Sequence, residues 1–174
     1  MSSQLRVDKI LPVDGAPTGG GGGIIQVQMG TLTSVFNTAS STMVDTGLSV
    51  SITPKFSTSK ILVNVSLGSF ANSGHYKRAF MNIVRDSTDV IVGDARTGHE
   101  VTAAVAPRGQ DDNYFQIPLS FMVVDSPATT SSVTYKVQAS KGSDGGTVYL
   151  NGNEGADAYS GNTASTIVVM EVSA

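Results

Sequence analysis

Residues 115–123, FQIPLSFMV, place an apolar side chain at every second position. Because successive side chains of a β-strand point to opposite faces, this spacing predicts a strand with one buried face. It is the most regular apolar stripe of the chain, and we expect it to form a central strand. Pro118 lies in its middle and has no N–H to donate, so it must occupy a position where the ladder needs no donor.

The same period of two recurs on both sides of this segment. Alternation runs through residues 48–52, 61–67 and 133–139, and residues 166–172 close the sequence as a mostly apolar strand. No segment has the i, i+3, i+4, i+7 stripe of an amphipathic helix. Roughly eight to ten short strands, separated by turns of Ser, Asp, Gly and Pro, predict an all-β antiparallel sandwich, with jelly-roll connectivity as the leading choice.

The first 23 residues interrupt this pattern. They open with a weak strand, too short to be stable without a docking surface, whose apolar residues are Leu5, Val7, Ile10 and Leu11. The run of glycines that ends this segment lacks Cβ atoms and can swing or follow an unusual backbone path. These hinge residues are Gly19, Gly20, Gly21, Gly22 and Gly23. The sequence thus predicts an anchoring strand at residues 1–14, a neck at 15–23 and a β-sandwich head at 24–174.

Composition argues against several classes of partner. Charged residues make up 14% of the 174 residues and the net charge is −3, with the basic residues scattered. This charge distribution offers no basic patch for nucleic acid or for an anionic membrane. The chain has no cysteine, hence no disulfide or thiolate metal site. No apolar run approaches the ~20 residues of a membrane span, and we expect no signal peptide because the N-terminus lacks a long apolar core.

Candidate catalytic groups do not converge in this sequence. The glycine run is followed by a strand, whereas a dinucleotide-binding loop needs a strand before it and a helix after it. His75 and His99 are the only histidines, and both lie in polar loops without an orienting partner nearby in sequence. We therefore expect no catalytic residue, no cofactor and no metal ligand set, and a role in binding rather than in catalysis.

Acidic loops leave one alternative open. Asp111, Asp112, Asp144, Glu154 and Asp157 stand among Gly and Asn residues, and calcium binds oxygen ligands from loops of this kind. No D-x-[DN]-x-[DN]-G frame is present, and Asp and Asn are also ordinary residues of tight turns.

Other loop residues favour molecular recognition. Exposed Tyr next to Asn, Asp and His is typical of surfaces that contact carbohydrate or protein, although Tyr also packs at strand ends. The candidate contact residues are His75, Tyr76, His99, Asn113, Tyr114, Asn151 and Tyr159.

Several predicted strands carry apolar residues on both faces. Leu62, Met122, Val124, Met81 and Ile83, or the set opposite to them, cannot all point into one small core. An apolar second face indicates that this face is covered too. Because no helices are predicted, sister subunits are the natural cover, and closed symmetry is the usual form of such assemblies.

The segment LRVDKILPVDG at residues 5–15, followed by residues 19–28, resembles the N-terminal segment of small virion structural proteins of marine tailed bacteriophages, the cyanophages and their relatives. Further similar stretches lie in the body of the chain, at residues 47–54, 59–63, 84–88, 125–128 and 164–172. More loosely, the head is similar to the trimeric jelly rolls of fibre tips and of the complement/tumour-necrosis-factor-like superfamily.

The resemblance implies a fibre-type protein of the virion. Its N-terminus would attach to another virion protein of the tail or capsid, and a homotrimeric β head would touch a glycan or protein on the host surface. Such a protein is made in the host cytoplasm without a signal peptide. Three alternatives remain: a capsid decoration or head-fibre protein, a carbohydrate-binding lectin module, and an enzyme that degrades host glycans.

Overall fold

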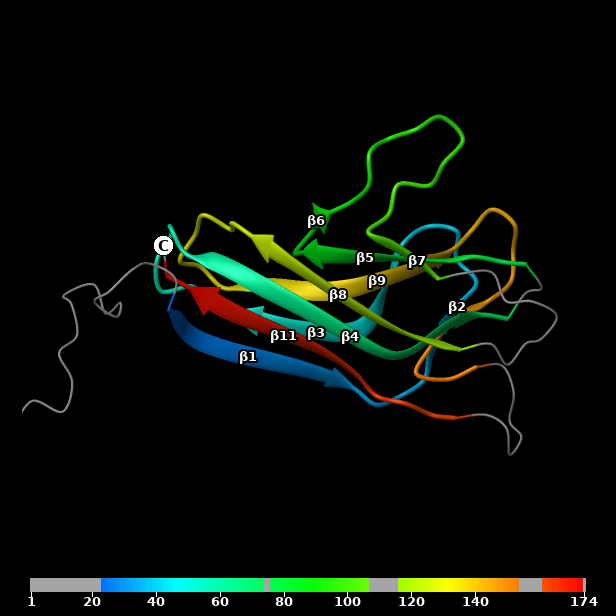
Figure 1. Cartoon of the computed structure of the whole chain (residues 1–174), viewed down its shortest axis with the longest axis horizontal. Coiled ribbons are helices and arrows are strands. Elements are labelled where there is room, and N and C mark those ends of the chain that lie inside the picture. The colour runs from blue at the N-terminus through cyan, green and yellow to red at the C-terminus, as the bar shows by residue number, and fades with distance from the viewer. Residues whose placement is uncertain (1–22, 74–75, 107–115, 154–160, 174) are drawn as a thin grey trace, which may run out of the picture.

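The computed structural model describes residues 23–73, 76–106, 116–153 and 161–173. These residues form eleven β-strands joined by loops (Figure 1). The strands are β1 (Ile24–Leu32), β2 (Phe36–Thr38), β3 (Val44–Ile52), β4 (Lys60–Asn72), β5 (Ala79–Arg85), β6 (Thr88–Ile91), β7 (Ala104–Ala106), β8 (Ile117–Asp125), β9 (Val133–Lys141), β10 (Val148–Leu150) and β11 (Ser165–Val172). Within these ranges no helix is long and apolar enough to cross a membrane.

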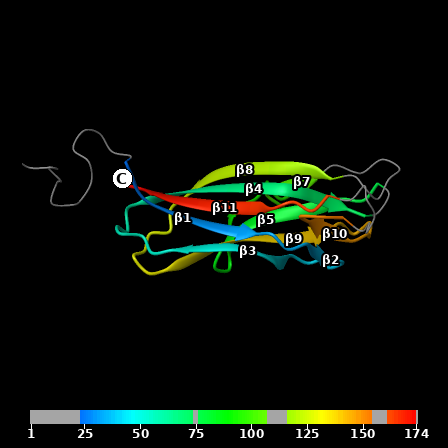
Figure 2. The same cartoon turned by 90° about the horizontal axis from the view of Figure 1, so that it is seen from below.

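The strands form two antiparallel sheets that lie face to face (Figure 2). In the sheet that we call the β4 sheet, β8 pairs with one side of β4, and the other side leads through β11 to β1 and through β10 to β2. In the other, the β9 sheet, the order is β3-β9-β5-β6, and β7 also pairs with β5. The orders β1-β11-β4-β8 and β3-β9-β5-β6 are those of a jelly roll. The predicted all-β sandwich with this connectivity is confirmed.

Strand β8 contains the regular apolar stripe, but it lies at an edge. Among the described residues it pairs with β4 alone, so the prediction of a central strand is wrong. Alternation reports that one face is buried, and it carries no information on how many neighbours the strand has. Pro118 fits this position, because an edge strand needs no donor on its open side.

The core lies between the inner faces of the two sheets. Inward and outward residues alternate along β3, β4, β9 and β11, so each strand buries every second side chain. The largest fully buried apolar side chains are Tyr135, Phe70, Leu48, Ile61, Leu67, Met81, Ile83, Leu150 and Ile167. Burial of this regularity fixes the register of each strand, since a slip by one residue would turn its apolar set outward.

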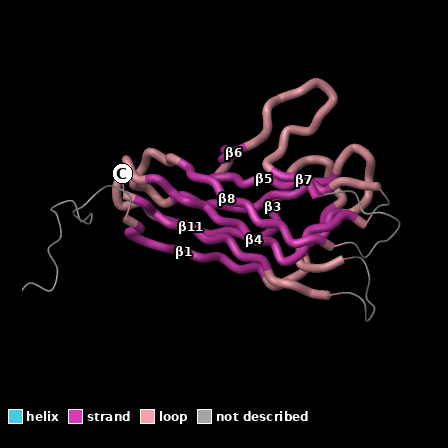
Figure 3. Tube along the Cα trace, viewed as in Figure 1, coloured by secondary structure: helices cyan, strands magenta, loops and turns pink. Residues whose placement is uncertain are grey.

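The elongated sandwich has two different ends, with loops gathered at each (Figure 3). At one end, which we call the neck end, the Ser173 N–H donates to the Gly23 carbonyl over 3.1 Å. At the opposite, distal end, the end of β4 meets turn 142–147, where the Thr147 N–H donates to Ser73 Oγ over 3.2 Å. Strand β1 begins at Ile24, directly after Gly23, and the predicted division into anchor, neck and head stays a prediction. The predicted anchoring strand and all of the neck except Gly23 lie outside the described residues.

Strand β5 is apolar on both faces, and both faces are covered. Met81 and Ile83 point into the core, while Phe80 and Val84 are also buried. The residues before β7 help to cover this strand, because Thr102 Oγ1 donates to the Met81 carbonyl over 2.7 Å. For β5, therefore, the expectation of cover by a sister subunit is wrong, and the chain covers this strand itself.

Candidate interaction surfaces

The outer face of the β4 sheet carries two rows of mainly apolar residues across four strands. Strand register aligns Val27, Met170, Leu62 and Val124 in one row, and Met29, Val168, Asn64 and Met122 in the next. A third row, farther from the neck, is made of Thr31, Thr166, Ser66 and Ser120. We call the apolar members of the first two rows the apolar face. Leu62, Met122 and Val124, expected to need cover from outside, thus lie together on one surface.

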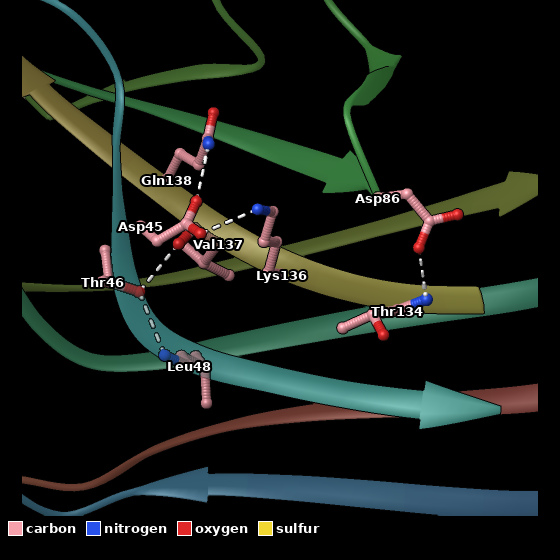
Figure 4. Close-up of polar contacts among 8 residues, drawn as sticks. All are labelled: Asp45, Thr46, Leu48, Asp86, Thr134, Lys136, Val137 and Gln138. Atoms are coloured by element: carbon pink, nitrogen blue, oxygen red, sulfur yellow. Dashed lines mark hydrogen bonds and ion pairs between the residues drawn. The ribbon is translucent and has the colours of Figure 1, made fainter. Parts of the chain in front are cut away.

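The outer face of the β9 sheet has the opposite character, and Figure 4 shows its polar contacts. Asp45 on β3 accepts hydrogen bonds from Lys136 Nζ at 2.7 Å and from Gln138 Nε2 at 2.6 Å, both on β9. These hydrogen bonds lower the pKa of Asp45, and the bond from Lys136 has the larger effect. At the neck end of the same face, the Thr134 N–H donates to Asp86 Oδ1 over 2.9 Å. One face of the sandwich is thus charged and hydrogen-bonded, and the other is apolar.

Glu171 organises the neck end from inside the molecule. It is fully buried on β11 and accepts hydrogen bonds from Gln26 Nε2 of β1 and from the Lys55 N–H at 2.7 Å. Gln26 also donates to the Thr53 carbonyl over 2.8 Å. Burial alone would raise the pKa of Glu171, but the hydrogen bonds to its carboxylate outweigh this effect and the pKa is lowered. The network ties the start of the head to the β3–β4 loop.

A second polar contact joins the two sheets near the same end. Asp125 at the end of β8 accepts from Arg85 Nη1 at 2.5 Å and from the Tyr135 hydroxyl at 2.7 Å. Burial, together with the neighbouring Asp125 carboxylate, raises the pKa of Tyr135 above its ordinary value, so this hydroxyl remains a donor. Because Arg85 and Tyr135 belong to the β9 sheet, the contact fixes the edge strand β8 to the opposite layer.

The β6–β7 connection projects from the body of the sandwich (Figure 1) and forms one wall of a cavity of about 260 Å³. The side chains that line it include Arg78, Phe80, His99, Glu100 and Val105. Arg78 Nε also donates to Asp144 Oδ2 over 3.3 Å. An open cavity with both charge signs, a histidine and one aromatic wall can accept hydrogen bonds from a ligand and donate to it.

The predicted contact residues have different outcomes. Tyr76 is exposed at the distal end, with a backbone φ of 56°, and His99 lines the cavity described above. The contact residues that lie outside the described residues are His75, Asn113, Tyr114 and Tyr159. Their role in recognition stays a prediction.

Asn151 does not belong to a contact surface, because it is fully buried. Its Nδ2 donates to the carbonyls of Leu32 at 2.8 Å and Ser34 at 3.2 Å, and its Oδ1 accepts from Ser165 Oγ at 2.5 Å. Asn151 directly follows β10 and lies where the pairing partner of β4 changes from β10 to β11. Its side chain also bonds to the segment that connects β1 with β2. The residue therefore closes two gaps in the sheet, and the prediction of a receptor contact here is wrong.

Sequence patterns did not identify Glu171 or the cavity residues Arg78 and Glu100 as important. A signal for Glu171 exists, because it occupies an inward position of a strand in which the two preceding inward residues are Ile167 and Val169. A carboxylate in such a position requires donors from elsewhere in the chain. The cavity had no such signal, since it depends on how a loop folds over β5.

Within the described ranges, no group of three or more His, Cys, Asp or Glu side chains is placed to hold a metal ion. Asp144 is paired with Arg78 instead. The other acidic residues considered for calcium are Asp111, Asp112, Glu154 and Asp157, and they lie outside the described residues. The calcium alternative therefore remains untested for them.

Comparison with known proteins gave matches among solved structures only. No protein-family model and no curated protein matches the chain. Similar structures include the VP2 subviral particle of infectious bursal disease virus, at 13% identity over 87% of this chain and 38% of that chain, with a TM-score of 0.41. The T13 particle of the same virus matches at 18% identity over 84% and 37%, with a TM-score of 0.43.

The Gt strain of this virus matches at 17% identity over 98% of this chain and 43% of that chain, with a TM-score of 0.41. The chain thus spans about two fifths of the length of these viral proteins. At this level of similarity, the jelly-roll assignment continues to rest on the strand order of the chain itself.

Proposed function

We propose that this chain is a fibre-type structural protein of a bacteriophage virion, mounted through residues 1–14 and displaying a homotrimeric head. The head projects from the tail and contacts a glycan or protein of the host surface. The protein acts in the virion by binding, without catalysis. Its partners are copies of itself, the virion protein that receives the anchoring strand, and the host receptor.

The observation that carries this proposal is the polarity of the sandwich. Gly23, where the neck joins the head, lies beside Ser173 at one end, and Glu171 locks this junction to the neighbouring loop. Tyr76 and turn 142–147 lie at the other end. A head that is held at one end and carries exposed loops at the other is the arrangement required of an attachment protein.

The resemblance of residues 5–15 and 19–28 to phage virion proteins supplies the second support. A short apolar strand such as Leu5 to Leu11 can add to an open sheet edge of a virion partner. A flexible neck lets several weakly binding heads reach receptors together, which raises the overall affinity through effective concentration.

The decisive test is the location of the head on the particle. Gold-labelled antibody against the purified chain should mark the tail of the phage that encodes it. Label on the shell would instead support the capsid decoration or head-fibre alternative, and no label on intact particles would overturn the proposal.

The anchor can be tested in the same phage by replacing Leu5 and Ile10 with Asp. Charged side chains cannot dock in an apolar strand site, so the altered protein should fold but should be missing from purified particles. Replacing Ser2 and Ser3 with Asp provides a matched control, because these residues lie outside the apolar pattern. Normal incorporation of the Leu5→Asp/Ile10→Asp protein would contradict the anchor.

The cavity at Arg78, His99 and Glu100 favours one second candidate, a carbohydrate-binding module that works without the virion. This alternative predicts that the isolated protein binds glycans and that substitutions at Leu5 and Ile10 leave binding unchanged. A glycan array probed with wild-type protein and with the Glu100→Gln variant tests whether the cavity binds glycans. Particle incorporation then distinguishes the two candidates, since the free-standing lectin should be missing from purified particles even with Leu5 and Ile10 intact.

A further inference from the structure

We propose that the apolar face of the β4 sheet is the surface on which copies of this chain pack against one another. This inference rests on the proposed function, which includes self-assembly, and it names the residues that make the contact. The occupant is a second copy of the same chain.

The exposure of the apolar face is the first argument. Met29 is 65% exposed, Met122 and Val124 are each 59% exposed, and Val27 is 52% exposed. The first row is apolar across all four strands, because Met170 and Leu62 lie between Val27 and Val124, and in the second row only Asn64, between Val168 and Met122, is polar. A contiguous apolar patch of this kind on a soluble protein marks an interaction site.

The charge pattern indicates what covers this patch. Every residue in the three rows is uncharged, and the row farthest from the neck consists of Ser and Thr. Lys60, at the neck end of β4, lies outside these rows, is exposed to solvent and donates to Ser126 Oγ over 2.8 Å. Neighbouring copies can therefore pack against one another through this face without burying an unpaired charge, which would be costly. A partner recognised by charge would instead find its complement on the β9 sheet, around Asp45 and Lys136.

The size of the face also suits a partner of similar size. With strands about 4.8 Å apart and a rise of about 3.4 Å per residue, the two apolar rows across four strands cover roughly 260 Å², and the whole outer surface of four eight-residue strands covers about 500 Å². A specific interface takes about 800 Å² from each partner. The apolar face can supply the central part of such an interface, with flanking loops at its rim. A single peptide strand would leave most of the face uncovered.

The position of the face brings copies together. Its apolar rows lie toward the neck end, where Ile24 starts β1, and the polar row of Ser and Thr lies toward the distal end. Chains mounted side by side by their N-terminal segments have their neck ends closest to one another. The most apolar part of the sheet thus lies where neighbouring heads converge.

The test is the mass of the full-length chain in solution, measured by size-exclusion chromatography with light scattering. The wild-type protein should have a multiple of the 18.0 kDa chain mass. The Met29→Glu/Met122→Glu double variant should elute as the single chain, because each substitution places a carboxylate in the contact. The Ser49→Glu variant, on the exposed outer face of β3, is the matched control and should assemble like wild type.

Met29 and Met122 are already exposed to solvent in the single chain, so the double variant should keep its fold. Circular dichroism and one cooperative thermal transition check this point. A double variant that stays fully assembled overturns the proposal and leaves a trimeric fibre protein intact. A wild-type chain that is monomeric overturns both the interface and the homotrimer. The gold-label experiment tests the place of the protein on the virion independently of this result.

A second measurement keeps the proposal falsifiable if the double variant fails to fold. The chain has no cysteine, so a single cysteine introduced by Met122→Cys or by Ser49→Cys reacts with maleimide at one site only. In the assembled protein, the Met122→Cys chain should react at least tenfold more slowly than the Ser49→Cys chain. Equal reaction rates would mean that a second copy does not protect this face from solvent, and would overturn the proposal.

Discussion

Asn151 combines a left-handed backbone φ of 66° with complete burial and hydrogen bonds to two separate strands. Asn tolerates this conformation better than other residues that have a Cβ. We expect Asn151→Ala to reduce the free energy of unfolding by about 2–4 kcal/mol, since it adds backbone strain and leaves the Leu32 carbonyl without its donor. Asn151→Gly, which relieves the strain but not the lost bonds, should cost less. Urea unfolding of both variants measures the difference, and an equal loss would exclude the backbone contribution.

Glu171 makes the stability of the head depend on acid. Its pKa in the folded state is lowered from the ordinary value of 4.5, so the folded chain releases this proton more readily than the unfolded chain. The contribution is therefore fully present above about pH 4.5 and is lost as the pH falls through the folded-state pKa. Thermal unfolding of wild type should weaken between about pH 5 and pH 3. In Glu171→Gln the drop should be smaller and the stability at pH 7 lower; an unchanged pH profile would contradict the role of this carboxylate.

At the scale of strands, the sequence pattern predicted which segments are strands and which faces are buried. Residues 48–52, 61–67 and 133–139 all lie inside observed strands with the predicted face inward. The pattern could not distinguish an edge from a centre, as β8 shows, because pairing partners come from distant parts of the chain. It also could not tell that, among the described residues, the loop before β7 covers β5 whereas nothing covers the outer face of β4.

The candidate site was less predictable than the fold for a related physical reason. Asn occurs both in exposed turns and at buried left-handed positions, so the residue type alone did not reveal that Asn151 is buried. Polar residues at inward positions of a strand, such as Glu171, carry more information. A buried polar side chain needs hydrogen-bond partners, and these partners come from segments that are distant in the sequence.

Strands β1 and β3 approach each other closely where the two sheets meet at one edge. A Cβ atom on Gly30 would lie 2.0 Å from the Ser49 carbonyl oxygen and 3.1 Å from Ile167 Cγ2. Because the nearest obstacle is backbone, Gly30→Ala should force β1 away from β3 and reduce the free energy of unfolding by about 2–4 kcal/mol. Gly161→Ala is the matched control, since a Cβ there meets nothing within 4 Å. Denaturant unfolding compares them, and similar midpoints would show that the two sheets can separate at this edge without cost.

At the scale of the whole molecule, the two outer faces assign different roles to the two sheets. The β9 sheet holds its charges in hydrogen-bonded pairs such as Asp45 with Lys136 and is suited to contact with water. The β4 sheet exposes the apolar face and is suited to contact with other copies. Among the described residues, the loop before β7 covers β5, whereas the outer residues Met29, Met122 and Val124 of the β4 sheet stay exposed, as expected if neighbouring heads cover them in the assembled fibre.

This division predicts that the thermal stability of the chain depends on its concentration. Assembly stabilises the folded state by mass action, and the unfolded chain has no such surface to offer. For a trimer, the two association steps each gain about 1.4 kcal/mol per tenfold rise in concentration, or about 1 kcal/mol per chain. The Tm of wild type should therefore rise by about 2–4 °C for each tenfold increase. In Met29→Glu/Met122→Glu the Tm should be independent of concentration, because the single chain melts alone; a wild-type Tm that is equally independent would mean that the sandwich is stable without its copies.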